Sequence, residues 1–407
     1  MSGESPNVLR MVRWRHEERV LTALRAHGAS SRADLGTHTG LSRATLYEIV
    51  RHLISTGALV EHNGGNTGRK TRGRPASMVA LNPASGLALG LDFGHRRVHA
   101  SVANVAHEIV ADGSRRYPER ASWTRRVALG LELVEQLAEE RHITLASLDG
   151  VGAGVVGPVA GASTSPRQRR GRTELVRDEL AARFGVPVRV DNNTRLAALA
   201  ESIWGSGAAI SNVLYLRLSH GVGGGLVIDG HLHFGAAGAA GELGHVSVEP
   251  DGVPCDCGGR GCLERYVALP VVLNQAGAAD LDDLKARLQR GTGQTVDAVR
   301  TAGERIGRVL AAACNVINPQ CVILGGELAE IGEPLSTPVR TALREHAHRQ
   351  VRQGLTVRHA RLGDEGAARG GVALVLRRSV LLAGYPMAEG TDPAATEESS
   401  PSSQLPS

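Results

Sequence analysis

The sequence predicts an α/β protein with a small basic helical unit at its N-terminus, and three observations support this fold class. Residues 12–57 carry apolar side chains at helical spacing, broken by glycines, and their surroundings are rich in arginine. Residues 85–382 combine buried-strand patterns with amphipathic helices. A stretch rich in cysteine and glycine, residues 241–266, stands among them. A chain of 407 residues with 42% hydrophobic content is long enough for two or three domains.

The N-terminal unit is predicted to be a helix-turn-helix followed by a β-wing. The first amphipathic helix covers residues 12–27 and ends at Gly28. Ser30 and Ser31 are both good N-cap residues for a second short helix over residues 32–39, which stops at Gly40. Ser42 caps a third helix that closes near Gly57. After it, short apolar strands flank a tip rich in glycine and arginine. Two helices joined by a tight turn that contains glycine are typical of a helix-turn-helix.

The charge of this unit predicts a polyanion as its partner. From residue 8 to residue 76 there are twelve basic and five acidic side chains, a net of +7 in a chain of net charge +5. The third helix of a winged helix places its N-terminal residues nearest the base edges, and wing arginines reach phosphates or the minor groove. A helical protein-interaction domain remains the alternative for the helices, and a solvated linker for the wing. The predicted contacts to double-stranded DNA are Ser42, Arg43, Thr45, Arg69, Arg72 and Arg74.

The cysteine-rich stretch predicts a structural zinc site over residues 245–262. Two thiolates separated by one residue, Cys255 and Cys257, are followed by Cys262, and His245 lies ten residues upstream of the first. Three sulfurs and an imidazole suit tetrahedral Zn²⁺. The glycines between them let the backbone turn tightly enough to direct the sulfurs at one centre. The alternative is a flexible loop with incidental cysteines.

The segment GELGHVSVEPDGVPCDCGGRGCLE resembles the signature of the ROK family, which contains bacterial sugar kinases and sugar-responsive transcriptional repressors. The resemblance implies a two-lobed actin- and hexokinase-like (ribonuclease H-like) body in which the histidine and the three cysteines bind zinc. It also implies that Glu242, His245 and Glu264 contact a sugar. A winged helix before such a body is similar to the repressor branch of the family.

Two glycine-rich segments resemble the phosphate loops of the ROK kinases but depart from them. Asp92 and Gly94 match a first loop of the type Asp-x-Gly-Gly-Thr-Lys, whereas His95 stands in place of its second glycine. In the second loop, His220 stands where a threonine is usual. An imidazole where glycine would let a phosphate approach the backbone argues against the usual nucleotide pose.

The segment VPVRVDNNTRLAALAES resembles the part of the family in which an Asn-Asp pair touches the sugar and the aspartate is the general base. Asn192 matches the asparagine, and Asn193 stands in the position of the aspartate. A neutral amide can hydrogen-bond a hydroxyl but is not a useful base. Asp191 is adjacent, but it is expected to point to another side. Sugar binding by Asn192 and Asn193 without efficient phosphorylation is therefore expected.

The sequence as a whole predicts a regulator rather than an enzyme. The expected organisation is a winged helix over residues 1–82, a sugar-sensing body over residues 83–385 and a disordered tail over residues 386–407. The expected partners are a DNA operator, a sugar or sugar-phosphate effector and further copies of the chain, as a dimer or tetramer. Without a signal-peptide pattern or a membrane span, a cytoplasmic location is expected. The rivals are an active hexose kinase with an accessory DNA-binding domain and a zinc-containing assembly protein.

Overall fold

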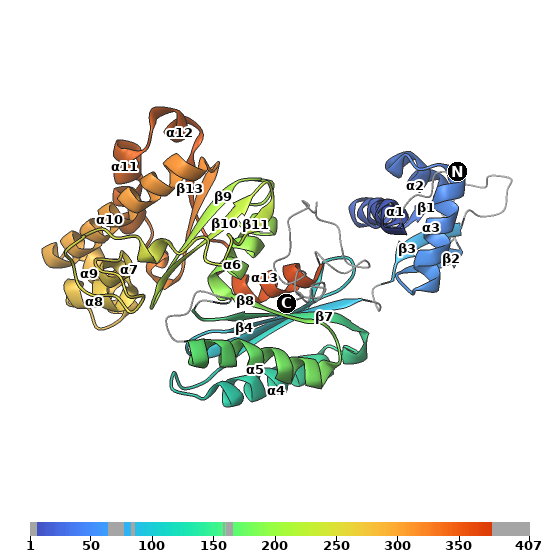
Figure 1. Ribbon diagram of the computed structural model, residues 1–407, viewed down its shortest axis with the longest axis horizontal. Coiled ribbons are helices and arrows are strands. Elements are labelled where there is room, and N and C mark those ends of the chain that lie inside the picture. The colour runs from blue at the N-terminus through green and yellow to red at the C-terminus, as the bar shows by residue number, and fades with distance from the viewer. Residues whose placement is uncertain (1–5, 64–76, 83–85, 158, 160–165, 377–407) are drawn as a thin grey trace, which may run out of the picture.

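Figure 1 shows the computed structural model of the protein, in which a small N-terminal unit stands beside a larger body of two lobes. It describes residues 6–63, 77–82, 86–157, 159 and 166–376. Within that part of the chain, no helix combines the length and the apolar character that crossing a membrane requires. The tail expected to be disordered lies outside the described residues, as do the wing arginines Arg69, Arg72 and Arg74.

The N-terminal unit is a winged helix with the three predicted helices. They are α1 (Pro6–His27), α2 (Arg32–Thr39) and α3 (Arg43–Ser55), and the strands β1 (Ser30–Ser31), β2 (Leu59–Asn63) and β3 (Ser77–Leu81) pair in the order β1-β3-β2. The helix ends follow from local chemistry. Ser31 and Asp34 form a capping box, and Gly40 ends α2 in the left-handed conformation with φ of 65°. Leu21, Leu35 and Leu53 are fully buried between the helices.

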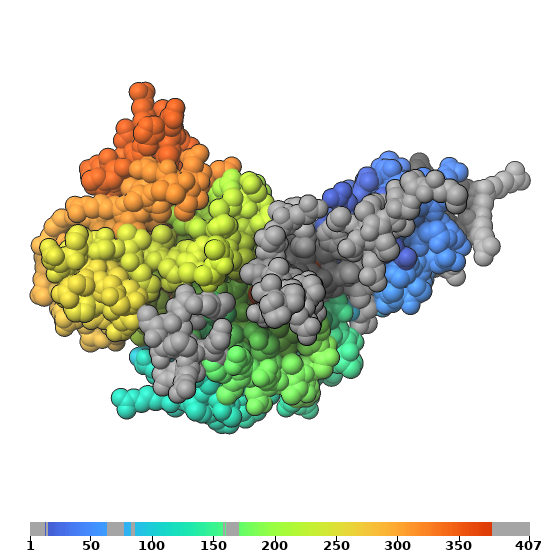
Figure 2. All heavy atoms as spheres, in the orientation of Figure 1, coloured from blue at the N-terminus to red at the C-terminus, as the bar shows by residue number. Residues whose placement is uncertain are grey.

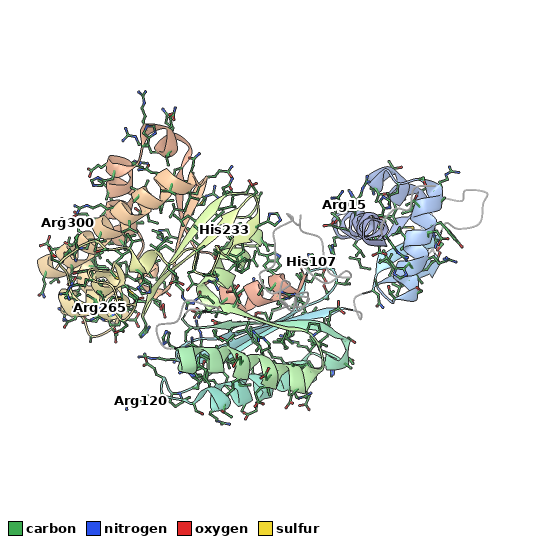
Figure 3. The ribbon with its side chains drawn as sticks, in the orientation of Figure 1. Arg15, His107, Arg120, His233, Arg265 and Arg300 are labelled. Atoms are coloured by element: carbon green, nitrogen blue, oxygen red, sulfur yellow. The ribbon has the colours of Figure 1, made fainter. Side chains whose placement is uncertain are left out.

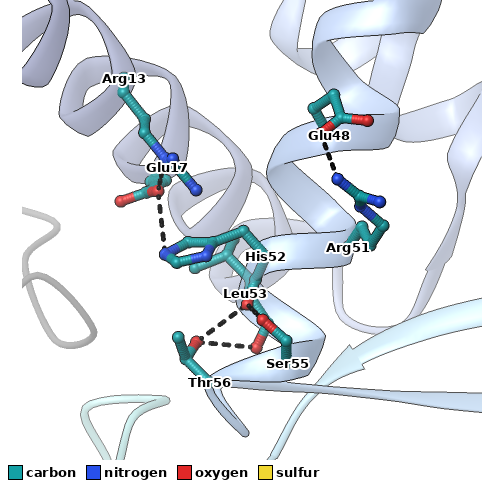
Figure 4. Close-up of polar contacts among 8 residues, drawn as sticks. All are labelled: Arg13, Glu17, Glu48, Arg51, His52, Leu53, Ser55 and Thr56. Atoms are coloured by element: carbon teal, nitrogen blue, oxygen red, sulfur yellow. Dashed lines mark hydrogen bonds and ion pairs between the residues drawn. The ribbon is translucent and has the colours of Figure 1, made fainter.

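A buried carboxylate joins α1 to α3 (Figure 4). Glu17 is 3% exposed, and its Oε1 accepts a hydrogen bond of 3.0 Å from the Arg13 guanidinium. The ring of His52 lies 3.7 Å from the same oxygen. Near the exposed side of α3, Arg51 pairs with Glu48 at 2.7 Å. The angle between α1 and the third helix is therefore held by a polar contact as well as by the apolar core.

The first lobe of the body is a five-stranded sheet in the order β6-β5-β4-β7-β8. Its strands are β4 (Leu87–Phe93), β5 (Arg97–Ala103), β6 (Ile109–Arg116), β7 (Leu148–Val155) and β8 (Val188–Asn192). The helices α4 (Trp123–Glu140) and α5 (Pro166–Phe184) cover one face, and α13 (Gly366–Leu376) covers the other (Figure 1). The approach of α13 requires glycine: a Cβ on Gly90 would lie 1.9 Å from the Ala368 carbonyl oxygen.

The basic run of residues 167–172 belongs to a helix of this lobe. A run of like charges is by itself typical of a solvated loop, but these residues lie in α5. At the end of this run, the Arg172 guanidinium lies 5.2 Å from the centre of the Trp123 ring on α4. Stacking on an aromatic face gives an arginine a partner that a charge count along the sequence cannot show.

The second lobe contains a five-stranded sheet in the order β11-β10-β9-β12-β13. Its strands are β9 (Val213–Leu218), β10 (Val222–Ile228), β11 (His231–His233), β12 (Cys321–Gly325) and β13 (Thr356–His359). The helix α6 (Asn193–Ile203) packs against α13 and β10, close to the first lobe. The remaining helices are α7 (Glu264–Val267), α8 (Leu269–Ala276), α9 (Leu281–Gln289), α10 (Gly293–Ile317), α11 (Glu333–His346) and α12 (Arg349–Gly354), and the 3-10 turns are η1 (Leu145–Ser147), η2 (Leu243–His245), η3 (Glu327–Ile331) and η4 (Gly363–Glu365).

The winged helix touches the first lobe through β3 and through the end of α1. Leu81 of β3 packs against an apolar cluster of the lobe that includes Val105. The Arg25 guanidinium at the end of α1 donates a hydrogen bond of 3.0 Å to the carbonyl oxygen of Val105, between β5 and β6. His107 in the same turn lies on the side of the body that faces the winged helix (Figure 3). In the space-filling view the winged helix and the segments around residue 260 lie at opposite ends of the molecule (Figure 2). Any signal between those ends must therefore pass through both lobes.

Candidate functional site

Four predicted metal ligands come together beside the second sheet. The ligand atoms of His245, Cys255, Cys257 and Cys262 all lie within 4.8 Å of one another. The Cys255 sulfur is 3.6 Å from Nδ1 of His245, and the sulfurs of Cys257 and Cys262 are 3.6 Å apart. The Gly259 N–H lies 3.4 Å from the Cys257 sulfur and lowers the pKa of that thiol. Three soft donors and one imidazole in this arrangement could hold a metal ion.

The backbone of this segment explains why the four ligands converge. Short bridges join Ser247 to Cys262 and Pro254 to Arg260, so the chain doubles back between His245 and the last cysteine. Gly261 has a φ of 63°, and a Cβ there would lie 1.6 Å from a backbone oxygen of a neighbouring residue. Only glycine fits that turn. The local sequence therefore determines the shape of the ligand cage.

His245 belongs both to the metal cluster and to the adjacent cleft. Its Nδ1 faces the sulfur of Cys255, whereas its Nε2 lies 3.9 Å from a carboxylate oxygen of Glu242. At 3.9 Å the two groups are at ion-pair distance and too far apart for a hydrogen bond. The candidate metal ligand His245 thus stands next to Glu242 at the edge of the cleft.

The cleft lies between the two lobes and has a volume of about 350 Å³. The first lobe contributes residues from the ends of β4, β7 and β8, and the second contributes β9, β10 and the metal segment. All five residues predicted to contact a sugar line this one cleft: Asn192, Asn193, Glu242, His245 and Glu264. Carboxylates and amides in a half-enclosed space are suitable partners for the hydroxyl groups of a polyol.

Glu264 joins the metal segment to the glycine-rich hairpin. One of its carboxylate oxygens accepts a hydrogen bond of 2.7 Å from the N–H of Val222. The same oxygen would lie 2.9 Å from a Cβ on Gly221, so this position has little room for a side chain. A movement of Glu264 would therefore displace or strain β9 and β10, the strands that form the hairpin.

The two asparagines at the start of α6 have different surroundings. Asn192 caps the helix: its side-chain oxygen accepts from the N–H groups of Thr194 at 2.9 Å and Arg195 at 3.2 Å. Asn193 is 5% exposed and interacts with Asp92, whose pKa is raised by burial although the asparagine opposes the shift. Asp191 points to another side, where it is buried and accepts a hydrogen bond of 2.8 Å from Arg195. The neutral amide of Asn193 therefore lines the cleft, whereas the carboxylate of Asp191 does not.

One backbone N–H in each glycine loop is already paired. The Gly94 N–H donates to the carbonyl oxygen of Arg97 at 3.0 Å, and the Ser219 N–H donates to that of Gly221 at 3.0 Å. His95 and His220, one from each loop, stack with their rings 5.9 Å apart. Burial lowers the pKa of His95. These two N–H groups are therefore not available to an anion in the cleft.

Sequence reasoning missed two charged residues of the cleft, Arg217 and Asp256. Arg217 lies on β9 and lines the cleft together with His95 and Asn193. The signal was present, because Arg217 is the single charged residue in the apolar run of residues 213–218. An arginine in a buried strand is unusual unless it has a partner or a ligand.

At the N-terminal unit, the structure separates the predicted DNA contacts. Arg43 is exposed at the first turn of α3. Ser42 is also exposed, but its hydroxyl caps the helix by accepting from the Thr45 N–H at 3.2 Å, and the two hydroxyls are 2.9 Å apart. Tyr47, one turn further along, is 54% exposed. Arg43 and Tyr47 therefore have the side chains most available to a base edge, while Ser42 and Thr45 hold the helix end.

Residues 88–378 match the profile of the ROK family over more than half of the chain. The chain belongs to the ROK family. Among its relatives are the xylose repressor of Caldicellulosiruptor bescii, 25% identical over 88% of this chain and 94% of that protein. The DNA-binding transcriptional dual regulator NagC of Escherichia coli is 27% identical over 86% of this chain and 89% of the relative. Both similarities extend across the winged helix and the body.

Solved structures show the same fold. A ROK family transcriptional regulator, a homologue of the E. coli MLC protein, superposes with a TM-score of 0.72 and 22% identity over 91% of this chain and 97% of its own. A ROK family glucokinase from Streptomyces griseus, solved with glucose and AMPPNP, has a TM-score of 0.61 and 26% identity. It matches 99% of its own length but only 71% of this chain. The fold class predicted from the sequence is confirmed.

Proposed function

We propose that this protein is a sequence-specific DNA-binding transcriptional regulator. It acts as a repressor of genes for sugar uptake or metabolism. The observation that carries the proposal is the winged helix in front of a complete ROK body. A whole glucokinase matches only 71% of the chain, whereas a ROK regulator matches 91%. The exposed Arg43 and Tyr47 on α3 then contact base edges, with the wing on the phosphate backbone.

A sugar or sugar phosphate is the proposed effector, bound in the cleft between the lobes. Glu242, Glu264 and His245 converge there with Asn192 and Asn193. The His245–Cys255–Cys257–Cys262 cluster would hold Zn²⁺, and the metal would supply rigidity to the segment that carries Glu242 and Glu264. Because the cleft has walls from both lobes, an effector that contacts both walls favours the closed arrangement.

The proposed switch couples this closure to the spacing of two winged helices in a dimer or tetramer. One winged helix reads too few base pairs for a specific site, so two half-sites are needed. The contact of Arg25 with the Val105 carbonyl links α1 to the first lobe and would carry the movement. A ligand that prefers one state by about 3 kcal/mol shifts the equilibrium more than 100-fold, which is sufficient for repression or release.

We propose further that the chain does not phosphorylate its ligand efficiently. Asn193 replaces the carboxylate that would accept the hydroxyl proton, and Asp191 is held in a buried pair with Arg195. The paired N–H group in each glycine loop supports the same proposal. Hexose turnover at the rate of ordinary kinases would contradict it and favour an active kinase with an accessory DNA-binding unit.

The experiment that tests this function is a titration of the purified full chain against DNA flanking its own gene. It is run at physiological salt with competitor DNA, with and without a panel of free sugars and sugar phosphates. Specific binding that one compound changes supports both halves of the proposal. Specific binding that no compound changes removes the effector, and no preference over competitor DNA removes the regulator.

A further inference from the structure

Arg217 is the residue of the cleft for which the proposed function gives no role. It is half-buried on β9 and lines the cleft of about 350 Å³. Among the described residues, its guanidinium has no hydrogen bond and no ion pair within 4 Å. A guanidinium carries five N–H donors and does not lose its charge. Burial alone would lower its pKa, but four acidic groups around it raise the pKa: Asp92, Tyr215, Glu327 and Asp364.

Two further polar side chains stand beside Arg217 in the wall of the cleft. Ser219 follows it on the same hairpin and is 7% exposed, and its hydroxyl has no partner among the described residues. His95 reaches the cleft from the first lobe and stacks on His220 at 5.9 Å. Burial lowers the pKa of His95 most, and the positive charges of His220 and Arg217 lower it further. A guanidinium, a hydroxyl and an imidazole therefore lie together at this end of the cleft.

Carboxylates also line this cleft. Glu242, Asp256 and Glu264 belong to its lining, and Glu264 lies against the hairpin itself, where it accepts a hydrogen bond from the Val222 N–H. Carboxylates accept hydrogen bonds from hydroxyl groups and repel an anion. The cleft thus offers acceptors for a polyol together with three donor groups, a guanidinium, a hydroxyl and an imidazole. A free sugar would leave the guanidinium without an anionic acceptor, at a cost in desolvation.

Arg217 also borders a second cavity, of about 530 Å³, but that cavity suits an anion poorly. Its lining includes the carboxylates of Glu327, Glu330 and Asp364. One oxygen of Glu327 is buried there without a hydrogen-bond partner. A phosphate entering from that side would meet three acidic side chains before it reached Arg217. The side of the first cleft, with Ser219 and His95, is therefore the favoured one.

We propose that the effector carries an anionic group, as a sugar phosphate does, and that Arg217, Ser219 and His95 bind this group while Glu242 and Glu264 bind the hydroxyls. The inference rests on the proposed function and deepens it by naming the class of effector. Arg217 is the specificity-determining residue, because it supplies the fixed charge and the planar pair of donors that a phosphate oxygen edge accepts. Asp92 is not among the residues that line the cleft.

The test is calorimetric titration of the zinc-loaded full chain with matched pairs of sugars. Each hexose and 2-acetamido-hexose is compared with its own 1-phosphate and 6-phosphate, and ADP and inorganic phosphate are titrated alone and in competition. The variants are Arg217→Gln, Arg217→Lys and His95→Gln. The control is Arg183→Gln, which removes an exposed arginine paired with Glu135 at 2.8 Å. Thermal unfolding and zinc content establish that each variant is folded.

The wild type is expected to bind one phosphorylated sugar about 10- to 100-fold more tightly than the same free sugar. Arg217→Gln should abolish that difference with the free sugar bound as before, His95→Gln should reduce it, and Arg217→Lys should keep part of it. The control should be unchanged.

Free sugar bound as tightly as any phosphate ester would overturn the inference and leave the proposed function standing. The inference is overturned in the same way if the Arg217→Gln and His95→Gln variants keep the preference, or if ADP or phosphate binds without competing. Failure of every sugar to bind would overturn both the inference and the proposed effector.

Discussion

Restoring a carboxylate at the position of Asn193 is expected to destabilise the protein rather than to create a kinase. Asn193 is 5% exposed and its side chain interacts with Asp92, which is 3% exposed. One oxygen of Asp92 already lacks a hydrogen-bond partner. The substitution Asn193→Asp removes an amide donor from this carboxylate and places a second negative charge beside it.

The size of the effect follows from the separation of the two charges. Two unit charges about 4 Å apart interact by about 4 kcal/mol at an effective dielectric constant of about 20. The nearby Arg217, which lowers the pKa of Asp92, offsets part of this repulsion. A loss of about 2–4 kcal/mol in unfolding free energy is therefore expected at pH 8. In a body of this size it corresponds to a fall in Tm of about 5–10 °C.

The loss must depend on pH in one direction. Like-charge repulsion and burial raise the pKa of the new carboxyl group in the folded state above its unfolded value of about 3.9. Between the unfolded and the folded pKa of this group, the folded state binds more protons than the unfolded state. The stability deficit therefore grows as the pH rises from the first value to the second. Well below the unfolded pKa of about 3.9, the carboxyl group is protonated in both states and the deficit from charge disappears.

The assay is thermal unfolding of the zinc-loaded variant between pH 5 and 8, together with an ATP-coupled hexose phosphorylation assay. Asn192→Asp is the matched control, because aspartate is as good an N-cap as asparagine and this position is only half-buried. A variant Asn193→Asp as stable as wild type at pH 8 would refute the charge argument. We expect that the missing base at position 193 is not the only feature that separates this chain from an active kinase. Turnover like that of an ordinary kinase in the variant would refute this expectation.

Three other outcomes are expected. Cys257→Ser should lose zinc to a chelator and lose the effector response together, because one candidate ligand of the cluster is removed. Cys314→Ala, a change at a buried position of α10, should keep both. Full zinc content in the serine variant would contradict the ligand assignment. Arg43→Ala should weaken operator binding by about 1–3 kcal/mol in a fluorescence titration. Arg51→Ala, which breaks a surface ion pair with Glu48, should weaken it less. The reverse order would indicate that another part of α3 contacts the bases. Glu264→Gln should weaken effector binding at least 10-fold while DNA binding without effector stays within about 2-fold; equal loss of both would indicate a structural role.

The parts of this protein that the sequence alone predicts are those built from neighbouring residues. Ser31 and Asp34 close one helix end, and Gly40 ends the same helix, all within ten residues of sequence. The metal ligands span only residues 245–262, and the glycines between them determine the turn. Short-range chemistry of this kind leaves a mark in the sequence because the interacting groups must keep fixed spacings.

The tertiary structure decided which groups share the cleft and what charge they present. Asp92, Asn193 and Arg217 come from three separate strands or helix ends, and no spacing in the chain relates them. The same holds for the basic run of residues 167–172 in α5. Arg172 stacks on Trp123 of another helix, and the spacing of the two residues in the chain does not indicate this contact. Burial and the field of distant charges arise only when segments pack together. The helix ends and the candidate metal ligands of this chain thus depend on residues that are close in sequence. The chemistry of its cleft depends on residues that only the packing of distant segments brings together.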